Sequence, residues 1–183
     1  MVVLGDSISA AYGINTTQGW VSLLQTRLKK QGYSYQVINA SISGDTSRTG
    51  LNRLKPILKQ HKPEIVIIAL GGNDGLRGLP FDEIRNSLST MISLSQQHGS
   101  KVILTGVRLP PNYGAAYNSS FKQLYQTITD HNNVTLVPDI LKNIAEHSNL
   151  MQADGIHPTA TAQTIILDNI WSGLEPLLSK KIQ

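Results

Sequence analysis

The chain has 183 residues, 40% of them hydrophobic, which fits a single globular domain, residues 1–183, with a sizeable buried core. Its formal net charge is +4, but the Lys29–Lys30 and Lys180–Lys181 pairs lie far apart and no aromatic residues interleave with them, so we expect no nucleic-acid partner. The chain has no cysteine, which excludes disulfides, thiolate metal sites and a cysteine nucleophile and leaves hydroxyl groups as candidate nucleophiles.

The apolar stretches of the chain are too short to cross a bilayer, which needs about 20 consecutive apolar residues. One of the longest runs from Ile65 to Leu70. We therefore expect a soluble protein without an integral membrane segment. The chain enters an apolar run directly after Met1, without the basic and apolar stretches of a secretory leader. This start fits either a cytoplasmic protein or a mature domain whose leader was replaced by a start methionine.

The N-terminal part of the chain predicts alternating strands and helices. Val2 to Leu4 is a short apolar run and predicts the first strand. Apolar side chains from Trp20 to Leu28 recur at helical spacing and predict an amphipathic helix, and the apolar run from Tyr35 to Ile38 predicts the second strand. A second helix is expected around Leu51 to Leu58, where Pro56 should kink the helix or mark a restart.

The same alternation continues toward the C-terminus. The further predicted strands are Ile65 to Leu70, Val102 to Thr105 and Val134 to Val137. The further predicted helices are Phe81 to Gln97, Ala115 to His131 and Thr159 to Leu178. The strands are almost continuously apolar, which is typical of a parallel sheet covered on both faces. We therefore expect an α/β fold, a three-layer α/β/α sandwich around a five-stranded parallel sheet.

Polar, glycine-rich segments follow the predicted strands. In a parallel α/β sheet, the ligand crevice lies beyond the carboxyl ends of the strands. These segments should therefore meet at one rim of the sheet, where glycines let backbone N–H groups approach a ligand. They are Gly5 to Ser7, Asn39 to Asp45, Gly71 to Gly75 and Arg108 to Gly114, and a fifth, Asp154 to His157, precedes the last helix.

Ser7, Asp154 and His157 are the material of a nucleophilic triad, because a serine hydroxyl becomes reactive when a histidine accepts its proton and a carboxylate orients that histidine. Taken singly, each has an ordinary structural explanation as a turn residue, a helix cap or a surface histidine. Gly44 and the segment Gly71 to Asp74 are likewise common turn formers. The order of all these segments, each after a strand, favours a catalytic site over those explanations.

Four blocks stand in a fixed order along the chain: Gly5-Asp6-Ser7-Ile8-Ser9, Ser43-Gly44-Asp45, Gly71-Gly72-Asn73-Asp74 and Asp154-Gly155-Ile156-His157. They resemble the four blocks of the GDSL or SGNH hydrolase family, and the match spans nearly the whole chain. Ile8 stands where the family's name-giving motif has leucine. Within the family, the chain looks most like the bacterial thioesterases, arylesterases and lysophospholipases. The resemblance implies a flavodoxin-like serine hydrolase that works without cofactor or metal, in the periplasm or after secretion.

The resemblance implies a role for each block. Ser7 would be the nucleophile, His157 the general base and Asp154 the carboxylate that orients the histidine. We expect Asp154 and His157 on one side of a helical turn that Pro158 ends. Three donors would bind the oxyanion: the backbone N–H groups of Ser7 and Gly44 and the side-chain amide of Asn73.

The resemblance also places the acyl chain beside the loops that follow the third and fourth strands. The residues expected to line this groove are Asp6, Gly72, Leu76, Leu79, Pro80, Arg108, Leu109, Pro110, Tyr113 and Ile156. The expected substrates are small molecules: carboxylic esters and thioesters with short to medium acyl chains, including aryl esters, acyl-CoA and lysophospholipids. Arg108 would either meet an anionic head group or CoA phosphate or pair with a neighbouring acid. We expect a monomer or a weak oligomer.

Other functions remain as alternatives. A carbohydrate O-acetyl esterase would use the same scaffold, and a binding module would keep the fold without turnover, although the intact triad speaks against it. Asp6, Asp74, Asp154 and His157 could in principle form a metal site. Nucleotide binding is disfavoured, because the glycines after the third strand lack the Lys-Ser/Thr of a P-loop.

Overall fold

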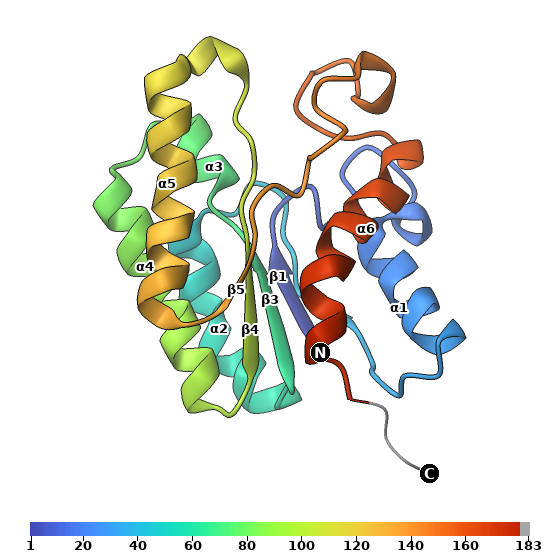
Figure 1. Ribbon diagram of the computed structural model, residues 1–183. Coiled ribbons are helices and arrows are strands. Elements are labelled where there is room, and N and C mark those ends of the chain that lie inside the picture. The colour runs from blue at the N-terminus through green and yellow to red at the C-terminus, as the bar shows by residue number, and fades with distance from the viewer. Residues whose placement is uncertain (180–183) are drawn as a thin grey trace.

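The computed structural model describes residues 1–179, and its centre is one parallel sheet (Figure 1). Neighbouring strands follow the order β2-β1-β3-β4-β5, and every pair is parallel. The strands are β1 (Val2–Gly5), β2 (Ile38–Asn39), β3 (Ile65–Ala69), β4 (Lys101–Thr105) and β5 (Thr135–Val137). The predicted five-stranded parallel sheet is therefore confirmed. The Lys180–Lys181 pair lies outside the described residues.

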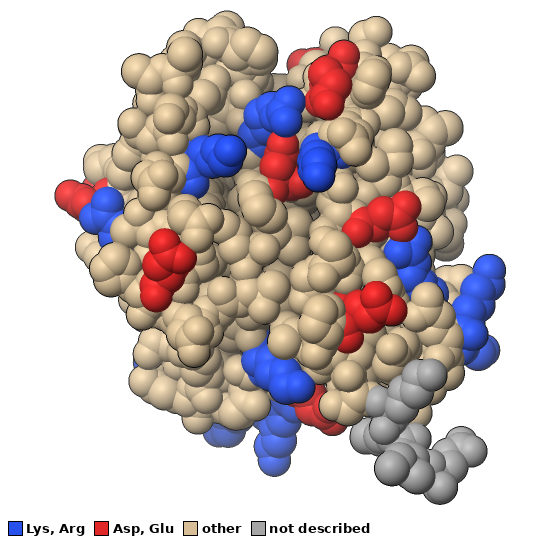
Figure 2. All heavy atoms as spheres, in the orientation of Figure 1, with Lys and Arg blue, Asp and Glu red and all other residues tan. Residues whose placement is uncertain are grey.

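Helices cover both faces of the sheet, as the three-layer prediction requires. One face is covered by α1 (Trp20–Lys30) and α6 (Gln163–Leu174), which pack on each other (Figure 1). The other face carries α2 (Ser47–His61), α4 (Phe81–Gln97) and α5 (Ala115–Asn132). Within residues 1–179, none of the helices has the length and apolar character to span a membrane. On the face drawn in Figure 2, basic and acidic side chains are interspersed.

The strands divide their side chains between two apolar layers. Val3 and Ile67 belong to the layer under α1 and α6, whereas their chain neighbours Leu4 and Ile68 belong to the layer under α2, α4 and α5. Successive side chains of a strand point to opposite faces of a sheet. Because both faces are covered, every residue of β1 and β3 is buried, which explains the continuous apolar runs in the sequence.

The second strand is shorter than predicted and lies later in the chain. Gln25 of α1 supplies the reason: its side-chain amide donates to the Tyr35 carbonyl (3.0 Å), and its oxygen accepts the Val37 N–H (2.8 Å). Those backbone groups are satisfied by a side chain and not by the sheet. Only Ile38–Asn39 of this segment therefore pairs with β1.

Pro56 lies inside α2, which runs through it without interruption, so the predicted alternative of a restart is wrong. Pro56 is exposed, and so is Asn52, whose carbonyl loses its helical partner because proline has no N–H. That carbonyl therefore lies on the solvent side of the helix. The helix also begins earlier than the predicted Leu51, because Thr46 forms a capping box with Thr49.

The last helix is shorter than the predicted range from Thr159 to Leu178. α6 is flanked by two short 3-10 turns, Ala160–Ala162 and Glu175–Leu177. Pro176 has no N–H to continue the helical hydrogen bonds, so the α-helix ends just before it. One further helix, α3 (Gly72–Leu76), was not predicted at all, because its glycines and asparagine are typical of turns.

We expect Tyr125→Phe to lower the free energy of unfolding by about 1–3 kcal/mol, measured by denaturant unfolding. The buried Tyr125 hydroxyl donates to the carbonyl of Leu70, directly after β3 (2.8 Å), and phenylalanine leaves that carbonyl without this donor. Tyr113→Phe is the control: its hydroxyl donates to the Leu76 carbonyl (2.7 Å), but Tyr113 is exposed, so water can replace the lost bond. If both variants lose the same free energy of unfolding, this explanation is wrong.

Candidate active site

The candidate site lies beyond the carboxyl ends of β1 and β3. The strand order reverses here, since β2 lies on one side of β1 and β3 on the other. In doubly wound sheets this switch point is where ligands bind. Ser7 follows β1 and Asn73 follows β3, so the topology brings the first and third sequence blocks together at one edge.

Ser7, His157 and Asp154 form one continuous chain of hydrogen bonds. The His157 Nε2 atom lies 2.9 Å from the Ser7 hydroxyl oxygen, and its Nδ1 atom lies 2.6 Å from Oδ2 of Asp154. The ring of Tyr12 packs on the imidazole with a centroid separation of 4.5 Å, a contact that the sequence did not indicate. The three predicted catalytic residues are thus brought together in an arrangement that can remove a proton from a serine hydroxyl.

The segment that carries Asp154 and His157 is a tight turn and not the predicted helical turn. Asp154 Oδ1 accepts the backbone N–H groups of Ile156 (2.9 Å) and His157 (3.0 Å). Pro158 does not end a helical turn; it pairs with Met151 in an isolated antiparallel bridge that closes the loop. The local hydrogen bonding of an aspartate side chain to following N–H groups explains the difference.

The same hydrogen bonds determine the charge state of Asp154. The backbone N–H of His157, the His157 side chain and the backbone N–H of Ile156 lower the pKa of Asp154 to about 2. Hydrogen bonds to the ionised form of a carboxyl group favour that form. Asp154 is therefore a carboxylate at neutral pH, next to the imidazole that would become positively charged during proton transfer.

Asp6 shapes the turn that presents Ser7. Its Oδ1 atom accepts the Ile8 N–H (3.1 Å), and its carbonyl accepts the Ala10 N–H (2.9 Å), so the chain folds back directly after β1. The side chain is buried, with 7% of the residue exposed, and this burial raises the pKa of Asp6 to about 6. The carboxyl group next to the nucleophile is thus harder to ionise than an ordinary aspartate.

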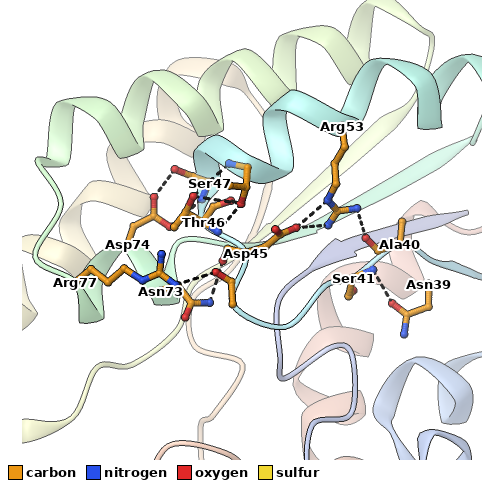
Figure 3. Close-up of polar contacts among 12 residues, drawn as sticks. Asn39, Ala40, Ser41, Asp45, Thr46, Ser47, Arg53, Asn73, Asp74 and Arg77 are labelled. Atoms are coloured by element: carbon orange, nitrogen blue, oxygen red, sulfur yellow. Dashed lines mark hydrogen bonds and ion pairs between the residues drawn. The ribbon is translucent and has the colours of Figure 1, made fainter.

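The loop after β2 carries Gly44, the predicted second oxyanion donor, and Figure 3 shows its chain neighbour Asp45 beside Asn73. Gly44 has a φ of +84°, a conformation that favours glycine. Asn73 donates its side-chain amide to the carbonyl of the next residue, Asp45 (2.9 Å), and Arg77 donates to the Gly44 carbonyl (3.0 Å). Asn73 and this loop therefore lie together, as the oxyanion prediction requires.

A partly buried ion pair holds that loop in place. Arg53 of α2 donates through Nε to the Asp45 carboxylate (2.8 Å) and through Nη1 to the Ala40 carbonyl, so it binds both ends of the loop (Figure 3). Asp74 accepts both the N–H (2.8 Å) and the hydroxyl (2.5 Å) of Ser47 at the start of α2. The sequence analysis missed Arg53, because a single arginine on a helix is usually solvated.

A cavity of about 340 Å³ opens onto Ser7 and His157. The predicted groove residues that line it are Asp6, Gly72, Leu76, Arg108, Leu109, Pro110 and Ile156. The lining residues that were not predicted include Val107, Leu141, Ala145 and Met151, which come from segments that carry no motif. Gly44 does not line the cavity, whereas Asn73 does.

Three predicted groove residues are not among those that line the cavity. Leu79 packs against the apolar layer under α2, α4 and α5, and Pro80 caps the start of α4. The Tyr113 hydroxyl donates to the Leu76 carbonyl and so supports a lining residue from outside. For these three residues, loop position alone was not sufficient to predict a side-chain direction.

Arg108 has acidic partners. Its guanidinium lies 3.0 Å from Asp139 and 3.3 Å from Glu146, so the alternative of pairing with neighbouring acids is correct. Among the four residues of the alternative metal site, Asp154 and His157 contact each other, but no third ligand joins them to form a site for a metal. Within residues 1–179, the structure has no group of three histidine or acidic side chains that could hold a metal ion.

Comparison with known proteins gives a consistent result. Residues 3–165 match the model of the GDSL-like Lipase/Acylhydrolase family. The chain is 49% identical over 178 residues to Esterase TesA of Pseudomonas aeruginosa, covering 97% of this chain and 89% of that protein. It is 38% identical over 179 residues to Thioesterase 1/protease 1/lysophospholipase L1 of Escherichia coli, covering 98% and 85%.

The fold gives the same match. The crystal structure of TesA superimposes with a TM-score of 0.95 at 49% identity, covering 97% of this chain and 98% of that one. The four sequence blocks, the sheet order and nearly full-length similarity thus agree. The chain belongs to the GDSL-like lipase/acylhydrolase family, as its sequence blocks had indicated.

Proposed function

We propose that the protein is a serine esterase that hydrolyses carboxylic esters and thioesters of short to medium acyl chains through an acyl-enzyme on Ser7. The observation that carries this proposal is the contact of His157 Nε2 with the Ser7 hydroxyl at 2.9 Å, with Asp154 bound to the other imidazole nitrogen at 2.6 Å. Membership of the family and the names of its relatives support the same activity.

The first half of the reaction follows from this geometry. His157 accepts the Ser7 proton as the hydroxyl oxygen attacks the carbonyl carbon of the substrate, and the electrons of the C=O bond move to its oxygen. Asp154 stabilises the imidazolium, since its carboxylate is ionised at neutral pH. The N–H groups of Ser7 and Gly44 and the Asn73 amide bind the oxyanion. Collapse of the intermediate expels the alkoxide or thiolate, which takes the proton from His157.

The second half repeats the chemistry with water. His157 removes a proton from water as the water oxygen attacks the acyl carbon on Ser7, and the acid leaves when the Ser7 oxygen takes that proton back. No step requires a metal or an organic cofactor. The cavity beside Ser7 is lined by Leu76, Leu109, Ile156 and other apolar side chains, and this lining favours an acyl chain over an acetylated sugar.

We also propose a periplasmic or secreted location and a monomer or weak oligomer. The resemblance to the family supports the location. Cell fractionation of the full-length protein in its native host tests it, and recovery in the cytoplasmic fraction would contradict it.

We expect Ser7→Ala and His157→Ala to lower kcat for p-nitrophenyl octanoate by about 10³-fold or more, because either change removes the nucleophile or its base. Steady-state release of p-nitrophenol measures this. The exposed Ser120→Ala and His147→Ala are the matched controls and should keep the activity of the parent protein. Hydrolysis by Ser7→Ala at the parent rate would exclude the acyl-enzyme.

Arg53→Met should lower kcat by about tenfold with little change in KM, because the loop that presents Gly44 and orients Asn73 loses its clamp. Arg48→Met, on an exposed position of the same helix, is the control. Thermal unfolding of both variants shows whether a lower kcat comes from a displaced loop in a folded protein or from a loss of folded protein. If Arg53→Met unfolds at a lower temperature but keeps its kcat at a temperature where it is folded, the clamp does not serve the oxyanion site.

Asp6→Asn should make the protein more stable above about pH 6, by up to about 3 kcal/mol, and leave its stability near pH 4 unchanged. The pKa of Asp6 is about 6 in the folded protein against an ordinary 3.8, so the folded state binds this proton more tightly. The stability that this proton provides is present at low pH and is lost as the pH rises through about 6. Asparagine has no such loss and keeps an oxygen for the Ile8 N–H.

Urea unfolding of Asp6→Asn and the parent at about pH 4 and about pH 8 measures this difference. Asp82→Asn is the control: it removes only an exposed ion pair with Arg85 and should change the stability by less than about 1 kcal/mol at either pH. Asp154 does not interfere, because its pKa of about 2 lies below its unfolded value, and its contribution is lost only as the pH falls below about 4. If the parent protein is as stable as Asp6→Asn at about pH 8, the pKa of Asp6 is not raised in the folded protein.

A further inference from the structure

A second and larger cavity, of about 820 Å³, adjoins the catalytic pocket. Its walls come from α5, α6 and the segments that follow β4 and β5. It shares Val107, Arg108 and Leu109 with the catalytic pocket, but no member of the triad lines it. Cavities of this size hold small molecules, so this one is large enough for a part of the substrate that does not react.

An ester or thioester extends in two directions from its scissile carbonyl. The pocket at Ser7, about 340 Å³ with Leu76, Leu109 and Ile156 in its lining, suits the acyl side. The alcohol or thiol side must extend elsewhere. The larger cavity shares Val107, Arg108 and Leu109 with the smaller one, so it lies directly beside the catalytic pocket and offers room for the leaving group.

The carboxylates of the larger cavity already have cationic partners. Asp139 lies 3.0 Å from Arg108, and Asp168 lies 2.6 Å from Arg27 of α1. Arg108 is also bound by Glu146, so its charge is more than compensated. Arg108 is therefore a poor candidate for binding a further anion on its own.

Two cations of the larger cavity have no such partner. Lys122 and Lys142 are exposed residues of its lining, and neither side chain has an ion pair or a hydrogen bond within residues 1–179. Figure 2 shows basic side chains gathered around a carboxylate in the hollow between α5 and α6. Uncompensated positive charge in a cavity whose carboxylates are already paired fits an anionic group.

We propose that this cavity is the leaving-group subsite and that it binds phosphate on the leaving group through Lys122 and Lys142. The inference rests on the proposed esterase and thioesterase function. Phosphate could belong to the nucleotide part of CoA in an acyl-CoA or to the head group of a lysophospholipid. Both sources place an anion away from the scissile bond, where two unpaired ammonium groups would attract it.

Matched substrates with and without phosphate test the subsite. Octanoyl-CoA is compared with S-octanoyl-N-acetylcysteamine, and a lysophosphatidylglycerol is compared with the monoacylglycerol of the same chain, so each pair keeps one type of scissile bond. The variants are Lys122→Gln, Lys142→Gln and the double variant. Lys59→Gln, an exposed lysine on α2 outside both cavities, is the control.

In the double variant we expect KM to rise about tenfold for a phosphorylated substrate, with kcat within about twofold and with the phosphate-free partner unchanged. A rise confined to octanoyl-CoA identifies the nucleotide as the occupant, and one confined to the lysophospholipid identifies the head group. If KM changes equally for both members of each substrate pair, or if Lys59→Gln changes KM in the same way, the proposed subsite is wrong. The proposed function fails separately, if the parent protein hydrolyses neither the phosphorylated nor the phosphate-free substrates.

Discussion

The candidate site depends on one hydrogen bond that joins the two ends of the chain, between the Ser7 hydroxyl and Nε2 of His157, which lie 150 residues apart. Ser7 is fixed by a central strand, whereas His157 lies in a loop that must be brought back to the same edge of the sheet. The packing of α6 on α1 does this, and the buried Gln163 of α6 accepts the backbone N–H of Trp20 at the start of α1 (3.1 Å). The triad is thus a product of the topology and not of local sequence.

Two carboxyl groups at the site have pKa values that their surroundings shift in opposite directions. Burial raises the pKa of Asp6 to about 6, while hydrogen bonds lower the pKa of Asp154 to about 2. The ionised form is therefore more favourable than usual for Asp154, on the side of the imidazole away from Ser7, and less favourable than usual for Asp6, next to the nucleophile. This asymmetry suits an imidazole that must become positively charged as it takes the Ser7 proton. Sites arranged for chemistry commonly give up stability in this way.

The strands, the helical layers and the triad could be predicted because each has a strong local or ordered signal: continuous apolar runs, helical spacing and four blocks in sequence. The errors have physical causes that such patterns do not contain. Tyr35 was predicted in a strand, but its carbonyl binds the Gln25 side chain and not the sheet. The helix α3 consists of residues that are typical of turns. Arg53 and Tyr12 acquire their roles only through contacts with distant segments, so no spacing in the sequence indicates them.

The most direct test of this account is to identify the residue that is modified when the protein reacts with a p-nitrophenyl alkylphosphonate. Such an ester transfers its phosphonyl group to an activated hydroxyl and stops there, so intact-mass measurement followed by peptide mapping locates the nucleophile. We expect one adduct per chain, on the peptide that contains Ser7. An adduct on another serine, threonine or tyrosine, or no adduct while ester hydrolysis continues, would contradict the account.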